Sequence, residues 1–146
     1  MRQRKPAAAL IAALMLTLAA CSMAPQKKAG TEAAPASLAV RELVGKAESA
    51  SAAGRHDQAS AYLERAIHIA PRNAVLWQNL AVVRYRQRRF EQAESLAMKS
   101  NALSAEPALK RRNWALIAAA RQARGDDEGA QAAQDHVKQL QQETGD

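Results

Sequence analysis

Aromatic residues make up only 3% of this chain of 146 residues, and there is a single cysteine. One cysteine cannot form an intramolecular disulfide, and a zinc site built from several cysteines is excluded. Six glycines and five prolines are too few for a collagen-like chain or a glycine-rich phosphate loop. Hydrophobic residues nevertheless account for 48%, and many of them are alanines. Alanine without β-branched or aromatic runs favours helices over a sandwich or barrel, so we expect a small, mostly helical protein.

The N-terminal region has the pattern of an export signal. Three of residues 1–5 are basic, and residues 6–20 are uncharged and rich in alanine and leucine. This stretch is shorter than the roughly 20 residues that a membrane span needs, and it matches the apolar region of a secretory signal peptide. It ends in Leu18-Ala19-Ala20-Cys21, which resembles the bacterial lipobox, where a dedicated peptidase cuts before a lipidated cysteine.

This resemblance implies a signal peptide over residues 1–20 and a lipid on Cys21 that anchors the chain to a membrane. The next residue is Ser22, whereas an aspartate there often retains such lipoproteins in the inner membrane. We therefore expect an outer-membrane protein that faces the periplasm. An uncleaved anchor with an incidental cysteine stays open as the alternative.

Removal of the signal changes the charge of the chain. The formal charge of +7 falls to +4, because three basic and no acidic residues lie in the signal. An exported protein of this charge is not expected to bind nucleic acid. Residues 21–37 contain Pro25, Gly30 and Pro35 and few large apolar side chains, so we expect the lipidated cysteine to be followed by a flexible linker.

The remaining segment, residues 38–146, contains a repeat. Ala59, Ala93 and Ala130 take equivalent places, and the motif around Trp77 returns at Trp114. The spacing is 34 residues from Ala59 to Ala93 and 37 residues for the other two pairs. This pattern resembles the tetratricopeptide repeat, a helix–turn–helix unit of 34 residues. The resemblance implies an all-α stack of three units, with six helices at about 38–53, 56–70, 74–88, 90–104, 107–124 and 127–143.

Individual residues predict where these helices begin, end and pack. Gly54 and Gly125 stand at turns, and Asn73 and Asp127 are candidate N-caps. Arg88 stands where the repeat commonly has a turn glycine. Trp77 is expected to pack between helices, and the alanines are expected to let antiparallel helices approach closely.

No group of residues predicts catalysis. His56, His68 and His136 do not show the spacing of metal ligands. The acidic residues 126–128 open a helix, where carboxylates offset the helix dipole. We therefore expect no enzymatic activity, no metal or other cofactor, and no small-molecule substrate.

Basic residues are concentrated in one region. Residues 84–124 hold ten basic and three acidic residues. Two interpretations stay open. One is a solvated helix face, and the other is an electrostatic patch for an acidic partner such as a protein, anionic lipid or cell-wall polymer.

A helical wheel places a second face on helix 74–88, opposite Trp77 and Leu80. The resemblance implies that this face lines the concave groove of the stack. The candidate partner-binding residues are therefore Val75, Gln78, Val82, Tyr85, Arg86 and Arg89, with Arg112 on the third repeat. The equivalent residues of the first repeat are Val44, Glu48, Ser51 and Ala52. This mixture suits a peptide segment of a protein partner. Capture of a free peptide C-terminus is not expected, since Val44 and Glu48 replace the lysine and asparagine that it needs.

The layout of a small three-repeat lipoprotein resembles the outer-membrane lipoproteins that activate class A penicillin-binding proteins. Residues 76–81 and 100–103 carry this resemblance. It implies a protein–protein interaction module that switches on a peptidoglycan synthase. The alternative is a pilotin-like tetratricopeptide lipoprotein that assists the assembly of a secretin or a type IV pilus.

Overall fold

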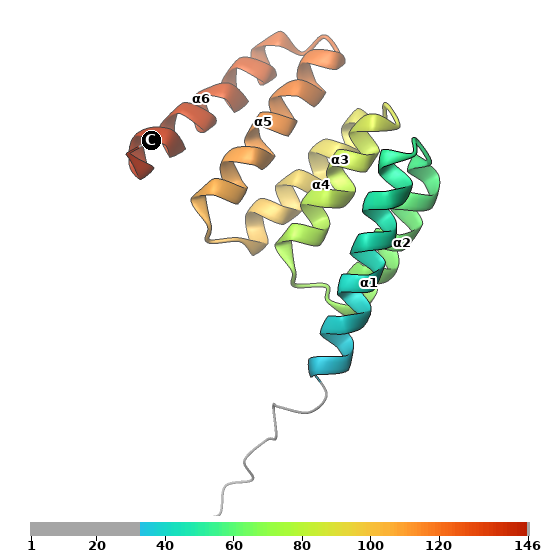
Figure 1. Cartoon of the computed structure of the whole chain (residues 1–146). Helices are drawn as coiled ribbons and strands as arrows, with labels where there is room; N and C mark the ends of the chain where they lie inside the picture. The colour runs from blue at the N-terminus through green and yellow to red at the C-terminus, as the bar shows by residue number, and fades with distance from the viewer. Residues whose placement is uncertain (1–32, 146) are drawn as a thin grey trace, which may run out of the picture.

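The computed structural model describes residues 33–145, and every regular element in that part of the chain is an α-helix (Figure 1). Successive helices pack against each other as three helical hairpins, which stack side by side. The predicted all-α repeat stack of six helices is confirmed. The predicted signal peptide and Cys21 lie outside the described residues. The helices are α1 Ala33–Ala52, α2 His56–Ile69, α3 Ala74–Arg86, α4 Phe90–Leu103, α5 Pro107–Ala123 and α6 Asp127–Thr144.

Helix α1 begins at Ala33, whereas the sequence predicted a start near residue 38. The first residues of α1 are mostly alanine, the residue with the highest helix propensity. Pro35 lies in the first turn, where its missing N–H removes no intrahelical hydrogen bond. Composition alone therefore placed these residues in the linker, although alanine and an early proline suit a helix start. Within residues 33–145, no helix is both long and apolar enough to cross a membrane.

The turns at the two predicted glycines have the expected geometry. Gly54 and Gly125 have φ of 73° and 79°, in the left-handed region that favours glycine. Arg88, at the equivalent turn of the middle hairpin, has φ of 61°. A side chain with a Cβ is strained in this conformation, so the departure from glycine that the sequence shows at this turn has a structural cost.

One of the two predicted N-caps is confirmed and the other is wrong. The side chain of Asn73 accepts a hydrogen bond from the Val75 N–H at 3.1 Å. At α6 the cap is Asp126 rather than Asp127, and its carboxylate accepts from the Gly129 N–H at 2.9 Å. Both of these consecutive aspartates suit an N-cap by residue type.

Leucine, isoleucine and valine side chains, together with four alanines, fill the space between the first hairpin and α3. We call this group the leucine cluster; its buried members are Val40, Leu43, Ala47, Ala50, Ala59, Leu63, Ala66, Ile67, Leu76, Leu80 and Val83. Trp77 is less buried than the sequence predicted. Its ring packs against the edge of the cluster and its indole N–H donates to the Pro71 carbonyl at 2.8 Å. Leu76, only 2% exposed, takes the central position instead.

Small side chains fill the space between the second and third hairpins. We call this group the alanine cluster; its buried members are Ala81, Ala97, Ile117, Ala118 and Ala133. The prediction that alanines lie where helices approach closely is confirmed here. Both clusters lie within residues 40–133.

A buried polar network accompanies the alanine cluster. The Asn113 side chain is fully buried and its Nδ2 donates to Ser100 Oγ and to Asn101 Oδ1, both at 2.8 Å. Ser100 Oγ donates in turn to the Ala74 carbonyl at 2.8 Å. This network gives the buried hydroxyl of Ser100 both a donor and an acceptor partner.

Several arginines of the basic region form ion pairs between helices. Arg84 binds Glu64 on α2. Arg121 binds Glu94 at 2.7 Å, and Arg124 binds the same carboxylate at 3.0 Å. The charge of residues 84–124 is thus partly used inside the fold, which favours the structural interpretation for these three arginines.

Candidate functional site: the groove between α1 and α3

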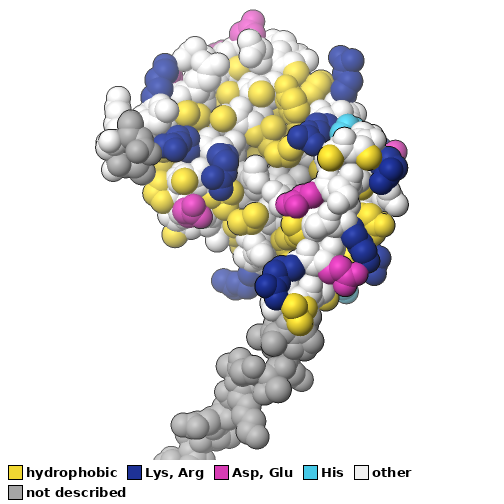
Figure 2. Space-filling model, in the orientation of Figure 1, with side chains coloured by type: hydrophobic (Ala, Val, Ile, Leu, Met, Phe, Trp, Pro, Cys, Tyr) yellow, Lys and Arg dark blue, Asp and Glu magenta, His cyan; other side chains and the backbone are white. Residues whose placement is uncertain are grey.

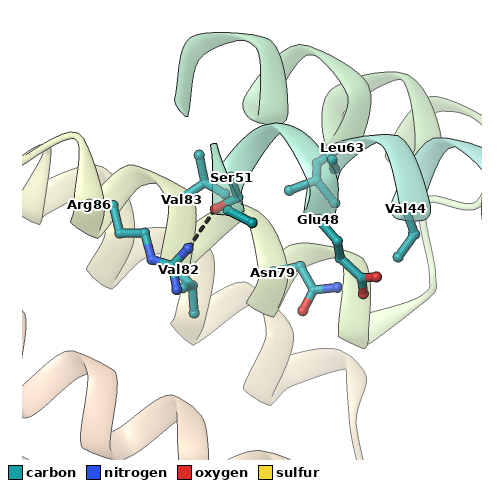
Figure 3. Close-up of a pocket in the computed structure, with 10 residues that line it drawn as sticks. Val44, Glu48, Ser51, Leu63, Asn79, Val82, Val83 and Arg86 are labelled. Carbon is teal, nitrogen blue, oxygen red and sulfur yellow. Dashed lines mark hydrogen bonds between the residues drawn. The ribbon is translucent and has the colours of Figure 1, made fainter. Parts of the chain in front are cut away.

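A groove with a cavity of about 370 Å³ lies between α1 and α3 (Figure 3). It is open to the surface and its floor is apolar. Helices α1 and α3 supply the two walls, and α2 contributes one floor residue. The lining residues are Val44, Ala47, Glu48, Ser51, Ala52, Leu63, Asn79, Val82, Val83 and Arg86.

Helical spacing explains why these side chains meet. Val44, Glu48 and Ser51 are separated by four and three positions, which places them on one face of α1. Asn79, Val82 and Arg86 follow the same spacing on α3, and their face lies beside the one that packs into the leucine cluster. Each wall of the groove is therefore the margin of a core-packing face.

The groove carries a negative and a positive group on its two walls. Arg86 donates to Ser51 Oγ at 2.5 Å, which holds the guanidinium across the groove from α3 to α1 (Figure 3). Glu48 lies beside Asn79 and Val44, away from Arg86 (Figure 3). Glu48 is exposed, and none of the ion pairs found within residues 33–145 involves its carboxylate. A ligand that enters the groove can therefore meet an apolar floor, an anion and a cation.

The structure brings together only part of the predicted site. Val82 and Arg86 line the groove with Glu48 and Ser51. The helical wheel predicted that these residues of the first and second repeats face the same groove. The other five candidates do not line it; they are Val75, Gln78, Tyr85, Arg89 and Arg112. Val75 is 45% exposed on the first turn of α3. Arg112 is exposed on α5.

Tyr85 has a packing contact that the sequence analysis did not anticipate. Its ring meets that of Phe90 edge-on, with centroids 5.4 Å apart and planes at 60°. Arg89, between the two rings in sequence, is the N-cap residue of α4 and carries no side-chain cap hydrogen bond. These contacts give Tyr85 a role in the α3–α4 turn, so its replacement would disturb packing as well as surface.

Sequence reasoning missed the groove floor. Leu63 and Val83 are buried members of the leucine cluster that also line the groove. A wheel assigns such residues to the core and gives no signal that one side of them stays open. Asn79 is not among the predicted site residues, and the structure places it directly in the wall.

No group of three His, Cys, Asp or Glu residues within residues 33–145 is arranged to hold a metal ion. His136 stacks on Trp114, with ring centroids 4.0 Å apart and planes at 19°. His56 lies half-buried at the start of α2.

Antiparallel helix pairs that stack in one direction and leave a groove beside their first helices define a helical-repeat binding module. Residues 50–111 match the family model of the tetratricopeptide repeat. Among solved structures, the chain is similar to the globular C-terminal domain of P. aeruginosa LpoP, with 37% sequence identity and a TM-score of 0.66. The match covers 68% of this chain and 94% of that one. No curated protein matches the chain. The chain belongs to the family of tetratricopeptide-repeat proteins that includes LpoP.

Proposed function

We propose that this protein is a lipoprotein of the outer membrane that faces the periplasm. We propose that it activates a class A penicillin-binding protein. The similarity to LpoP supports the assignment, because LpoP matches over almost its whole globular domain. The lipobox-like Leu18-Ala19-Ala20-Cys21 supports the anchor. The protein is proposed to act by binding and not by catalysis.

The observation that carries the proposal is the groove between α1 and α3. Its apolar floor and its two opposite charges suit a segment of a partner protein that inserts an apolar side chain and pairs a charge at each end. Arg86 and Val82 are proposed as the centre of this site. Gln78 and Tyr85 lie near Val82 on α3 by helical geometry, and Arg89 follows the end of α3 as the N-cap residue of α4.

The early start of α1 limits how far the domain can reach. Eleven residues, 22–32, separate Cys21 from Ala33. A fully extended chain of that length spans at most about 40 Å. A domain anchored at Cys21 would stay close to the membrane, so the synthase would have to bring its docking segment to the lipoprotein.

A charge exchange tests the groove. We expect Arg86→Glu to weaken binding to a purified class A synthase by at least about tenfold, or 1.4 kcal/mol. Stimulation of its glycan polymerisation should fall in parallel. The double variant Glu48→Lys with Arg86→Glu leaves the net charge unchanged and should bind as poorly, because both charges are then misplaced. Arg65→Glu, on the exposed side of α2, serves as the single-charge control and should bind like the parent.

The outcomes separate the alternatives. Parent-like binding and stimulation by the Arg86→Glu variant would show that the groove is not the docking site. Pull-down from envelope extract with the lipidated parent distinguishes the partner classes. Recovery of a secretin without a synthase would favour the pilotin alternative. For the anchor, Cys21→Ser should block labelling with a lipid precursor, and normal maturation of that variant would contradict the lipoprotein assignment.

A further inference from the structure

The two ends of the helical stack differ in composition. The anchor end is formed by the start of α1, the turns α2–α3 and α4–α5, and the end of α6 (Figure 1). The far end is formed by the turns α1–α2, α3–α4 and α5–α6. The chain from Cys21 enters the stack at the anchor end, because it leads directly into α1.

The net charge of the described residues lies in the anchor-end half of the stack. When each helix is divided at its midpoint, the half toward the anchor end holds eight basic and four acidic residues, a balance of +4. The far half holds eight of each and is neutral. The basic residues of the anchor half are Arg41, Arg65, Arg72, Lys99, Lys110, Arg111, Arg112 and Lys138.

Ion pairing increases this asymmetry. In the far half, Arg84, Arg121 and Arg124 bind carboxylates, and in the anchor half Lys138 binds Asp135. None of the ion pairs found within residues 33–145 involves Arg41, Arg65 or Arg72. The anchor end therefore presents cations that the fold does not neutralise.

Exposed apolar side chains gather in the same half. All four large apolar side chains that are exposed among the described residues belong to it, namely Leu38 (58% exposed), Ile69 (41%), Val75 (45%) and Met98 (47%). Ile69 shares a surface hollow with Arg65 and His68. Figure 2 shows apolar and basic side chains next to the point where the described chain begins. Cations beside protruding apolar groups are typical of surfaces that bind the interface of an anionic bilayer.

We propose that the anchor end of the stack docks on the anionic phospholipid surface to which the chain is tethered. The basic side chains contact lipid headgroups, and Leu38, Ile69 and Val75 enter the interface. This inference rests on the proposed lipid anchor at Cys21, which brings this end nearest to the membrane. Docking would turn the far end, with the Arg86 side of the groove, away from the bilayer and toward an arriving partner.

Vesicle flotation of the isolated stack, residues 33–146, tests the docking without the lipid. The stack contains both apolar clusters, and the similar domain of LpoP has been solved as a separate globular unit. We expect binding to vesicles of phosphatidylcholine with phosphatidylglycerol and several-fold weaker binding to phosphatidylcholine alone. Raising the salt from about 0.05 to 0.5 M should reduce the binding to the anionic vesicles.

Two matched triple charge reversals locate the surface. The anchor-end variant, Arg41→Glu with Arg65→Glu and Arg72→Glu, should lower the vesicle partition coefficient by at least about tenfold. The far-end variant, Arg55→Glu with Arg88→Glu and Arg89→Glu, changes the net charge by the same amount. It should change the vesicle partition coefficient less than twofold. Equal losses in the two variants would show non-specific attraction and overturn the proposal, as would absence of binding to anionic vesicles.

The apolar contribution has its own variant. Leu38→Ser with Ile69→Ser keeps every charge and should weaken binding to the anionic vesicles several-fold, with unchanged circular dichroism. Unchanged binding would show that apolar insertion does not occur and would overturn that part of the proposal. Synthase binding in detergent, without vesicles, is measured separately. The two measurements can therefore show loss of membrane docking with normal synthase binding. They can equally show loss of synthase binding with normal membrane docking.

Discussion

The leucine cluster and the alanine cluster hold equivalent hairpin contacts together by different means. The first, around Leu63 and Leu76, buries branched side chains. It is stabilised by the large area of apolar surface that these side chains remove from water. The second brings helix backbones close over Ala81 and Ala97, and supplements this contact with hydrogen bonds at Asn113. The same repeat can thus be stabilised by side-chain volume or by close approach. The two halves should therefore be sensitive to opposite substitutions.

The largest expected effect is truncation in the leucine cluster. Leu76 is 2% exposed, and Leu76→Ala removes its contacts and leaves a cavity. We expect a loss of about 2–5 kcal/mol in the free energy of unfolding, measured by urea denaturation. Leu38→Ala, at an exposed position, is the control and should change stability little. A loss below about 1 kcal/mol at Leu76 would remove the distinction between the clusters.

Enlargement in the alanine cluster should come next. Ala97 is fully buried, and Ala97→Leu would separate helices that now lie close together. We expect a destabilisation of about 2–3 kcal/mol by the same measurement. The exposed Ala102 lies on the same helix, so Ala102→Leu should be nearly neutral. Tolerance of leucine at position 97 would mean that the second interface has unfilled space.

Removal of the buried amide tests the polar part of the second interface. Asn113→Ala takes the Nδ2 donor away from Ser100 and Asn101, and leaves their oxygens partly unsatisfied. The expected cost is about 1–2 kcal/mol. Adding Ser100→Ala should cost less than the sum of the two single changes, because both residues belong to one network. Full additivity would contradict this coupling.

The smallest effect is expected at a turn outside both clusters, and it has the opposite sign. Arg88 has φ of 61° and its side chain is exposed, so Arg88→Gly relieves the strain without loss of packing. We expect a gain of about 0.5–1 kcal/mol, visible as a higher melting temperature. Gly54→Ala, at the matching turn of the first hairpin, should lower it. A lower melting temperature for Arg88→Gly would show that Arg88 makes a stabilising contact.

The elements themselves could be predicted from the sequence because their signals are local. Gly54, Asn73 and Gly125 each act on the backbone within one turn, and the structure finds them where the repeat places them. The 34- and 37-residue spacings then indicate where each helical hairpin begins. At Ala33 and Asp126 the prediction was wrong because neighbouring residues of the same type offered several acceptable boundaries.

The candidate site was only partly predictable because a groove is a property of two packed helices. A wheel of one helix identifies Val82 and Arg86 as neighbours of the core face. It cannot show that Arg86 reaches Ser51, 35 positions away in sequence. It also cannot show that the ring of Tyr85 packs against the ring of Phe90. For the same reason, the pairing of Arg84 with Glu64 could not be read from the basic run itself.

The hydrogen-bonded chain from Asn113 through Ser100 to the Ala74 carbonyl fixes the register of the helices. Alanine-lined surfaces are nearly smooth, so sliding one helix along another changes the buried area little. Hydrogen bonds do not tolerate such sliding, because a shift of one turn, about 5.4 Å, would leave buried polar groups without partners. Three short bonds align α3, α4 and α5 at once. A polar network that adds little net free energy of folding can in this way determine the helix alignment. It selects one among several alignments that bury similar apolar areas.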